Sequence, residues 1–192
     1  GSRIWKADDC KLSFCDGVLP FFGLMLAFVI VCYATVLPLD GPLSFSQHTD
    51  NMAHLGTIIS MSETGYYSIF NSSIYAVTPY NQIPVEVHPA FYPAGWHIIC
   101  SIISSMVNVS ASMAENAVNL VFSGCVYPAG MYALSRRVFS DERDRMQRFL
   151  SIVMAVCFAA FPYGMYLFGP LYSNLAAYCV LPAFIALAVT EI

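Results

Sequence analysis

The four histidines of the chain lie in a single polar interval that contains no lysine or arginine. They are His48, His54, His88 and His97. The basic residues are confined to the first eleven positions and to residues 136–148. Imidazole rings bind transition metals and exchange protons near neutral pH. We therefore expect the interval from about residue 40 to residue 97 to hold the chemistry of the protein.

Asp50 and His54 are four residues apart, which places them on one face of a helix. A carboxylate oxygen and an imidazole nitrogen could hold a divalent metal ion between them. Alternatively, Asp50 could accept a proton from an acceptor hydroxyl while His54 orients it. A third reading gives Asp50 only a capping role at the start of the helix, where it interacts with the helix dipole.

A second cluster combines a carboxylate, two imidazoles and aromatic rings that can stack on a sugar or an isoprenoid. These rings could equally form an aromatic belt at the membrane surface. The cluster consists of Glu86, His88, Tyr92, Trp96 and His97.

Two asparagines fall inside or beside apolar runs, Asn119 within one and Asn174 at the start of another. Polar groups at membrane depth usually face the interior of a helix bundle or a cavity. Both are therefore candidates for substrate binding.

The composition is that of a membrane protein. The chain of 192 residues is 58% hydrophobic and 10% charged, and its mean hydropathy is +0.63. Soluble domains carry about 25% charged residues. Several apolar runs approach the length needed to cross a bilayer. No basic patch is available to bind nucleic acid, so we expect no nucleic-acid partner.

The apolar runs predict an all-α fold, a polytopic bundle of transmembrane helices with two interfacial helices in the first outer loop. Predicted spans are 18–39, 114–134, 149–168 and 175–190, and the outer loop covers 40–112.

Both interfacial helices are predicted within this loop. The first begins at a cap on Thr49 or Asp50, reaches Thr64 and stops at Gly65. The second covers 96–108. It could instead be a short span, but its 13 residues make about 20 Å of helix, less than the hydrocarbon core of about 30 Å.

The arginines predict the orientation of the spans. Arg136 and Arg137 follow the second span, whereas Arg143, Arg145 and Arg148 precede the third. By the positive-inside rule, residues 136–148 and the N-terminus face the cytoplasm. The loop 40–112 then lies on the outer face of the cell membrane.

The two ends of the chain suggest a piece of a longer protein. The sequence opens with Gly1-Ser2, which is typical of a cleavage scar, and it stops at Ile192 directly after an apolar run. We expect residues 1–17 to form a cytoplasmic segment that includes this scar, and residues 18–192 to form one transmembrane domain.

The order of elements resembles the first outer loop of type C membrane glycosyltransferases, which include oligosaccharyltransferase catalytic subunits and protein mannosyltransferases. There, an acidic residue begins an interfacial helix that ends in Gly-Tyr, Tyr-Pro-x-Gly opens a second, and an asparagine enters the next span. The matching residues are Asp50, Gly65-Tyr66, Tyr92 to Gly95, and Glu115 to Asn119.

Over residues 18–190 the chain more closely resembles a family of uncharacterised bacterial polytopic membrane proteins. Their Asp-x-x-x-His pattern is matched by Asp50 and His54, and their Tyr-Pro-x-x-Trp-His pattern by Tyr92 to His97. A third pattern, Gly-Pro-Leu-Tyr-x-Asn, is matched by residues 169–174 and adds Tyr172 to the candidate substrate-binding residues.

The resemblance to type C enzymes implies transfer of a sugar from a polyprenyl-phosphate donor in the membrane lipid to a glycan or protein acceptor, at the outer face. It makes Asp50 the base or the metal ligand. Many of these enzymes carry a second acidic motif in the next outer loop, but residues 169–174 hold no carboxylate. His54, His88 or Glu86 would then complete a metal site, or the reaction would proceed without metal.

Two other functions remain open from the sequence. One is a non-catalytic module, either a transporter subunit or a scaffold for envelope polysaccharide assembly. The other is a metal or pH sensor that uses the four histidines.

Overall fold

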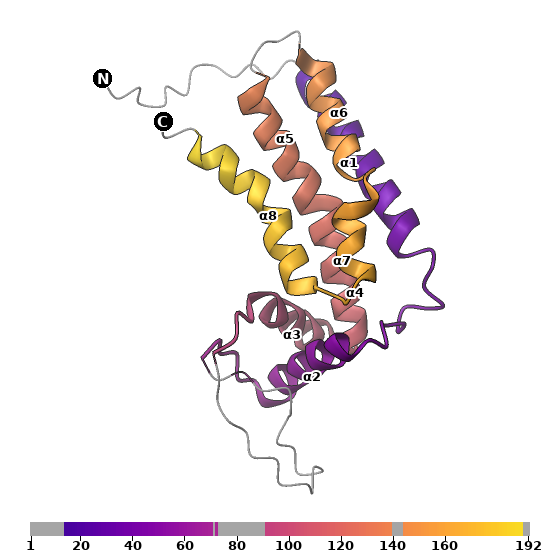
Figure 1. Cartoon of the computed structure of the whole chain (residues 1–192), viewed down its shortest axis with the longest axis vertical. Coiled ribbons are helices and arrows are strands. Elements are labelled where there is room, and N and C mark those ends of the chain that lie inside the picture. Colours follow the sequence, from indigo (N-terminus) through magenta and orange to yellow (C-terminus); the bar gives the residue numbers. More distant parts are fainter. Residues whose placement is uncertain (1–13, 71, 73–90, 140–143, 190–192) are drawn as a thin grey trace, which may run out of the picture.

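The computed structural model describes residues 14–70, 72, 91–139 and 144–189, and these form helices joined by loops (Figure 1). The predicted all-α fold is confirmed. Three helical segments are long and apolar enough to cross a membrane, namely Gly17–Thr35, Ala111–Val138 and Arg145–Leu167. Large apolar side chains such as Phe21, Phe22 and Phe184 are exposed on the outside of the bundle. A membrane-embedded bundle explains this exposure, because lipid rather than water covers such a surface.

The first helix, α1, covers Phe14–Thr35 and so begins and ends four residues before the predicted span. Its end is set by Pro38, because a proline disfavours helical dihedral angles in the residue before it. The segment from residue 36 to residue 48 then leads to α2.

Both helices predicted in the loop are present. α2 covers Thr49–Thr64, and Gly65 ends it in the left-handed conformation at φ 68°. The cap differs from the prediction, because His48 is the N-cap residue and its side chain makes no capping hydrogen bond. α3 covers Gly95–Val107 and ends at Asn108, also in the left-handed conformation.

The second span is one long helix with a local widening. α4 covers Ala111–Val121, a π-helical turn η1 covers Phe122–Val126, and α5 covers Tyr127–Val138. Pro128 has no N–H to donate and its ring crowds the carbonyl four residues earlier. A π-bulge at this point accommodates the proline within a continuous helix.

The third span is interrupted. α6 covers Arg145–Ala155, a π-helical turn η3 covers Ala159–Tyr163, and α7 covers only Gly164–Leu167. Phe161 is extended, with φ −139° and ψ 135°, as expected for the residue before Pro162. The predicted span 149–168 is therefore two helical pieces rather than one helix.

The last helix, α8, covers Tyr172–Ala188 and packs along α5. With 17 residues it is shorter than the three spanning segments. The two helices approach closely at Gly130, where a Cβ atom would lie 3.1 Å from the backbone nitrogen of Ala183. Small residues at such crossings are a common basis of helix association in membranes.

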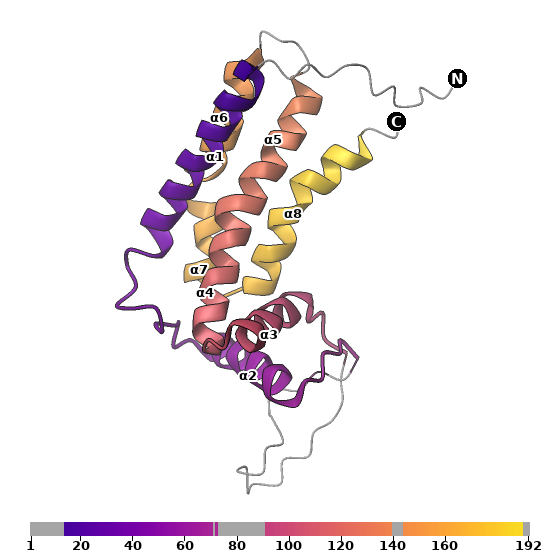
Figure 2. The same ribbon diagram turned by 180° about the vertical axis from the view of Figure 1, so that it is seen from behind.

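α2 and α3 lie side by side across one end of the bundle in both views (Figures 1 and 2). The end of α5 and the start of α6, which carry four arginines, lie at the opposite end. The histidine-bearing helices and the fixed positive charges of the described residues are thus separated by the length of the bundle.

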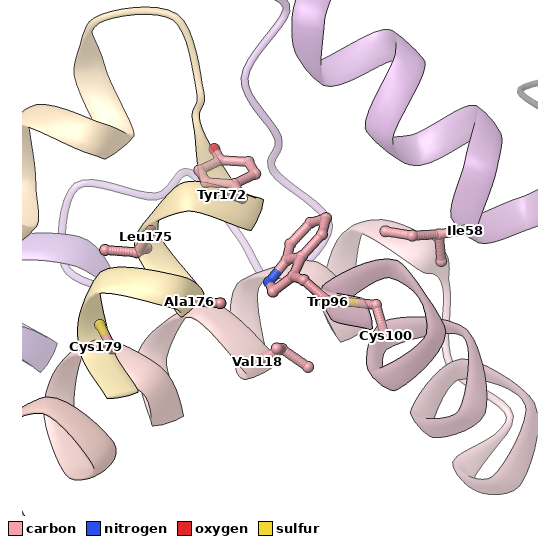
Figure 3. Close-up of a cluster of buried hydrophobic side chains, with 8 residues drawn as sticks. All are labelled: Ile58, Trp96, Cys100, Val118, Tyr172, Leu175, Ala176 and Cys179. Atoms are coloured by element: carbon pink, nitrogen blue, oxygen red, sulfur yellow. The ribbon is translucent and has the colours of Figure 1, made fainter. Parts of the chain in front are cut away.

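A cluster of buried side chains from α2, α3, α4 and α8 packs against the residues of the candidate site (Figure 3). Trp96 is buried between the start of α8 and the α2–α3 pair, in contact with residues from four helices. The buried members of this cluster are Ile58, Trp96, Cys100, Val118, Tyr172, Leu175, Ala176 and Cys179.

Candidate functional site

Two histidines from the two crossing helices form a hydrogen-bonded pair. His54 lies on α2 and His97 on the first turn of α3, and their Nδ1 and Nε2 atoms are 2.8 Å apart. The other ring nitrogen of His54, Nε2, lies 3.0 Å from the carbonyl oxygen of Pro170. Three segments that are distant in sequence therefore meet at one imidazole.

The carbonyl of Pro170 fixes where the protons of this pair reside. A carbonyl oxygen only accepts, so Nε2 of His54 must be the N–H donor. In a neutral ring its Nδ1 then accepts, and it does so from Nε2–H of His97. This leaves Nδ1 of His97 with a lone pair and no hydrogen-bond partner in the described structure.

Burial keeps both rings neutral. Burial, and to a smaller extent the neighbouring His54, lowers the pKa of His97 to about 3. The pKa of His54 is also lowered by burial, although the hydrogen bond to Pro170 and the charge of Asp50 act in the opposite direction. The lowered pKa values favour the neutral form of both rings at pH 7.

Aromatic rings hold the pair in place. Trp96 stands edge-on to both imidazoles, with ring centroids 5.5 Å from His54 and 4.9 Å from His97. Tyr172 lies 5.6 Å from Trp96 and 5.9 Å from His54. Tyr92 leans edge-on against His97 at 5.3 Å.

The turn at Gly169 brings the third motif against α2. Gly169 has φ 61°, and a Cβ atom there would lie 3.2 Å from Oδ2 of Asp50. The positive φ favours glycine here, and a side chain at this position would have to displace the carboxylate of Asp50 slightly. Asp50 also faces His48, with 3.9 Å between its Oδ2 and Nδ1 of that histidine.

Asp50 lies outside the histidine pair. Its side chain is 56% exposed, and the nitrogens of His54 are bonded to His97 and Pro170 instead. The charge of Asp50 reaches His54 only as a weak influence on its pKa. Asp50 and His54 were predicted to act together; they lie on the same helix, but no hydrogen bond joins them.

Two cavities flank the pair. A small one of about 190 Å³ is formed where α2 and α3 meet. It is lined by Ala53, His54, Thr57, Ser72, Phe91, Tyr92 and His97. A larger one of about 590 Å³ lies between the end of α1, the loop that follows, the middle of α4, the η3–α7 segment and the start of α8. Tyr172 links the larger cavity to the histidine pair, because it lines this cavity and its ring contacts that of His54.

The comparison with known families gives one match. A model described as a family of unknown function, DUF6541, matches residues 2–192. The chain belongs to the DUF6541 family. No curated protein and no solved structure matches the chain.

The remaining predicted site residues of this DUF6541 chain differ in their surroundings. Asn119 is buried and accepts a hydrogen bond from Nε1 of Trp96 at 3.0 Å, so it positions the aromatic cluster. Asn174 is exposed on the first turn of α8 and lines neither cavity. Glu86 and His88 lie outside the described residues.

A metal ion held jointly by Asp50 and His54 does not fit this arrangement. Both ring nitrogens of His54 are already engaged, so neither offers a free lone pair to a metal. Within the part of the chain that the structure describes, no three residues among His, Cys, Asp and Glu gather as a metal site. We therefore assign no step of the chemistry to a metal at these two residues.

Several residues of the site were given no role from the sequence. Thr57, which helical spacing places on the same face as Asp50 and His54, and Phe91 line the small cavity beside predicted residues. Glu115 is buried at the start of α4 beside Asn51. A carboxylate at the start of an apolar span is a signal in itself. Pro170 contributes only a backbone carbonyl, which no residue pattern reveals.

Proposed function

We propose that this chain belongs to a membrane glycosyltransferase-like enzyme that transfers a sugar from a polyprenyl-phosphate donor. The observation that carries the proposal is the meeting of all three motif segments at His54. Asp50 and His54 come from the first, Tyr92 to His97 from the second, and residues 169–172 from the third. A purely structural membrane helix pair has no need of such a convergence of polar and aromatic groups.

The larger cavity supports the sugar and isoprenoid parts of this proposal by its size and its uncharged groups, although its described lining includes no lysine or arginine for a phosphate. Sites for small ligands commonly enclose about 300–1,000 Å³, and this one has about 590 Å³. Its apolar wall includes Val36 and Leu39 beside α1, which suits an isoprenoid chain. Its polar groups can hydrogen-bond a sugar, and they include Asn116, Tyr163, Tyr166 and Tyr172.

The charge distribution supports placing this end of the bundle at the outer face of the membrane. The four arginines of α5 and α6 lie at the other end, and the positive-inside rule assigns that end to the cytoplasm. The sugar donor and the glycan or protein acceptor then meet outside the cytoplasm.

Asp50 acts as the base in this proposal. Its carboxylate takes the proton of the acceptor hydroxyl while the hydroxyl oxygen attacks the anomeric carbon of the donor sugar. The bond from that carbon to the phosphate oxygen breaks, and polyprenyl phosphate leaves with the electron pair. The configuration at the anomeric carbon is inverted. Glycosyl transfer with one base and one displacement needs no covalent enzyme intermediate.

A non-catalytic role is the second candidate, and one observation favours it. Asp50 is more than half exposed and lies outside the small cavity. A transporter subunit or a scaffold for envelope polysaccharide assembly would present such a carboxylate without a reaction.

Replacing Asp50 by Asn tests the proposed function. The amide keeps the size of the side chain but cannot take up the proton, so transfer should fall by about 10²–10⁴-fold. The full natural protein in lipid nanodiscs is supplied with radiolabelled polyprenyl-phosphate monosaccharides, and label in water-soluble glycan or protein is counted.

Glu63→Gln is the matched control, because Glu63 is an exposed carboxylate on the last turn of the same helix. It should transfer sugar at the wild-type rate. Undiminished transfer by Asp50→Asn contradicts the role of Asp50. Absence of transfer by the wild-type protein with every donor favours the scaffold instead.

A further inference from the structure

The small cavity beside the histidine pair carries an unmatched hydrogen-bond acceptor. Nδ1 of His97 has a lone pair without a partner, although the side chain is fully buried. An unpaired polar atom in such a place costs about 1–3 kcal/mol unless a ligand or a water bonds to it. His97 lines the cavity of about 190 Å³. Its Nδ1 is almost inaccessible in the described structure, so a group in that cavity becomes the donor when the ring turns slightly towards it.

The charge of the lining excludes an anionic ligand. Among the described lining residues none is lysine or arginine, and the sequence has no such residue from 12 to 135. Burial also keeps His97 uncharged, because it lowers the pKa of this ring to about 3. A phosphate in the cavity would lose its hydration and gain no counter-charge.

The shape and the aromatic rim indicate a ring-shaped ligand. The cavity is smaller than the range of about 300–1,000 Å³ for drug-sized ligands, which leaves room for about one sugar ring. Phe91 and Tyr92 line it and are exposed. Phe70 lies beside them, with its ring 6.0 Å from that of Phe91. Aromatic faces of this kind pack on the C–H face of a pyranose.

We propose that this cavity binds one uncharged sugar ring, and that a hydroxyl of the sugar donates a hydrogen bond to Nδ1 of His97. If the proposed function holds, the bound ring is part of the sugar acceptor; this assignment rests on the proposed function. Binding of the ring itself does not depend on whether transfer occurs.

Trp96 offers a direct readout of binding, because its ring lies 4.9 Å from that of His97. Trp5 is the other tryptophan of the chain, so a Trp5→Phe background leaves Trp96 as the single tryptophan, which is excited selectively at about 295 nm. This protein in nanodiscs is titrated with the methyl glycosides of glucose, galactose and mannose, and separately with glucose 6-phosphate. We expect a saturable fluorescence change with at least one neutral glycoside and none with the phosphate.

Two variants test the contacts in the same background. His97→Phe keeps a ring but lacks the acceptor, and should weaken binding about tenfold, the effect of losing one hydrogen bond of about 1.4 kcal/mol. Tyr92→Ala removes one aromatic wall of the cavity and should weaken binding similarly. Because Tyr92 is partly exposed, this variant remains informative if His97→Phe fails to fold. His48→Phe, a matched change outside the cavity, should bind like the parent.

Lack of a saturable change with every neutral glycoside overturns the proposal, as does equal binding by the Tyr92→Ala and parent proteins. Preferred binding of glucose 6-phosphate also overturns it. The two proposals fail separately: sugar binding without transfer contradicts only the proposed enzyme, whereas transfer without binding of any neutral glycoside contradicts only this cavity assignment.

Discussion

Replacing His54 by alanine is expected to lower the free energy of unfolding by about 3–5 kcal/mol. The change leaves two buried groups without a hydrogen-bond partner, namely Nε2–H of His97 and the carbonyl of Pro170. Each unpaired group costs about 1–3 kcal/mol. The lost ring contacts with Trp96 and Tyr172 add to this. Thermal unfolding of the protein in detergent micelles measures the effect as a lower melting temperature.

His48→Ala is the matched control, since this histidine is only six positions earlier but is exposed. Its expected effect is within about 0.5 kcal/mol of zero. Two further variants divide the contribution of His54. Asparagine reaches the position of Nδ1 and retains the bond to His97, whereas glutamine reaches that of Nε2 and retains the bond to Pro170. Each should lose less stability than alanine. Equal melting temperatures of His54→Ala and His48→Ala would mean that the histidine pair does not stabilise the packing of α2 against α3 and the turn at Pro170.

Replacing Trp96 by alanine is the second change with a large expected effect, again about 3–5 kcal/mol of unfolding free energy. Trp96 is buried where α3, α4 and α8 meet (Figure 3). Its loss opens a cavity in the core that supports the histidine pair. Trp96→Phe retains most of the packing but removes the N–H donor to Asn119, and should cost about 1–3 kcal/mol.

A double-mutant cycle separates packing from the hydrogen bond. If the bond between Trp96 and Asn119 accounts for the loss in Trp96→Phe, then the same change should cost markedly less in an Asn119→Leu background. Chemical or thermal unfolding of the four proteins gives the coupling energy. Purely additive losses would show that Asn119 does not act through Trp96.

Local signals in the sequence predicted much of the helical structure. Gly65 ends α2 in a left-handed conformation as predicted, because only the local chain decides whether a glycine adopts it. The second interfacial segment was predicted as 96–108 and is helical over Gly95–Val107. The sequence places Pro162 inside the third span and so predicts an interruption there, which the structure has at Phe161.

The pairing of the site could not be predicted in the same way. The hydrogen bond between His54 and His97 joins positions 43 residues apart, and the bond to Pro170 joins positions 116 apart. Helical periodicity indicates which residues share a face, but not which face packs on which neighbour. Helical spacing gives α3 a polar stripe of His97, Ser101, Ser104, Ser105 and Asn108, of which the structure buries the first three and exposes the last two. Ser101 bonds to the backbone of α2, and the apolar side with Ile99 faces outwards.

The central claim is that His54 and His97 form a neutral pair with both protons on Nε2, which leaves Nδ1 of His97 free. Nitrogen NMR of ¹⁵N-histidine-labelled protein reports the protonation of each ring nitrogen directly. Replacing His48 and His88 by Gln leaves only these two histidines in the chain. The pattern predicted for both rings at pH 7 is a protonated Nε2 and an unprotonated Nδ1. Because burial lowers the pKa of His97 to about 3, its ring should keep this pattern as the pH falls to 5, well below the ordinary value of about 6.5. A protonated Nδ1 on His97 at pH 7, or a positively charged His97 ring at pH 6, would contradict it.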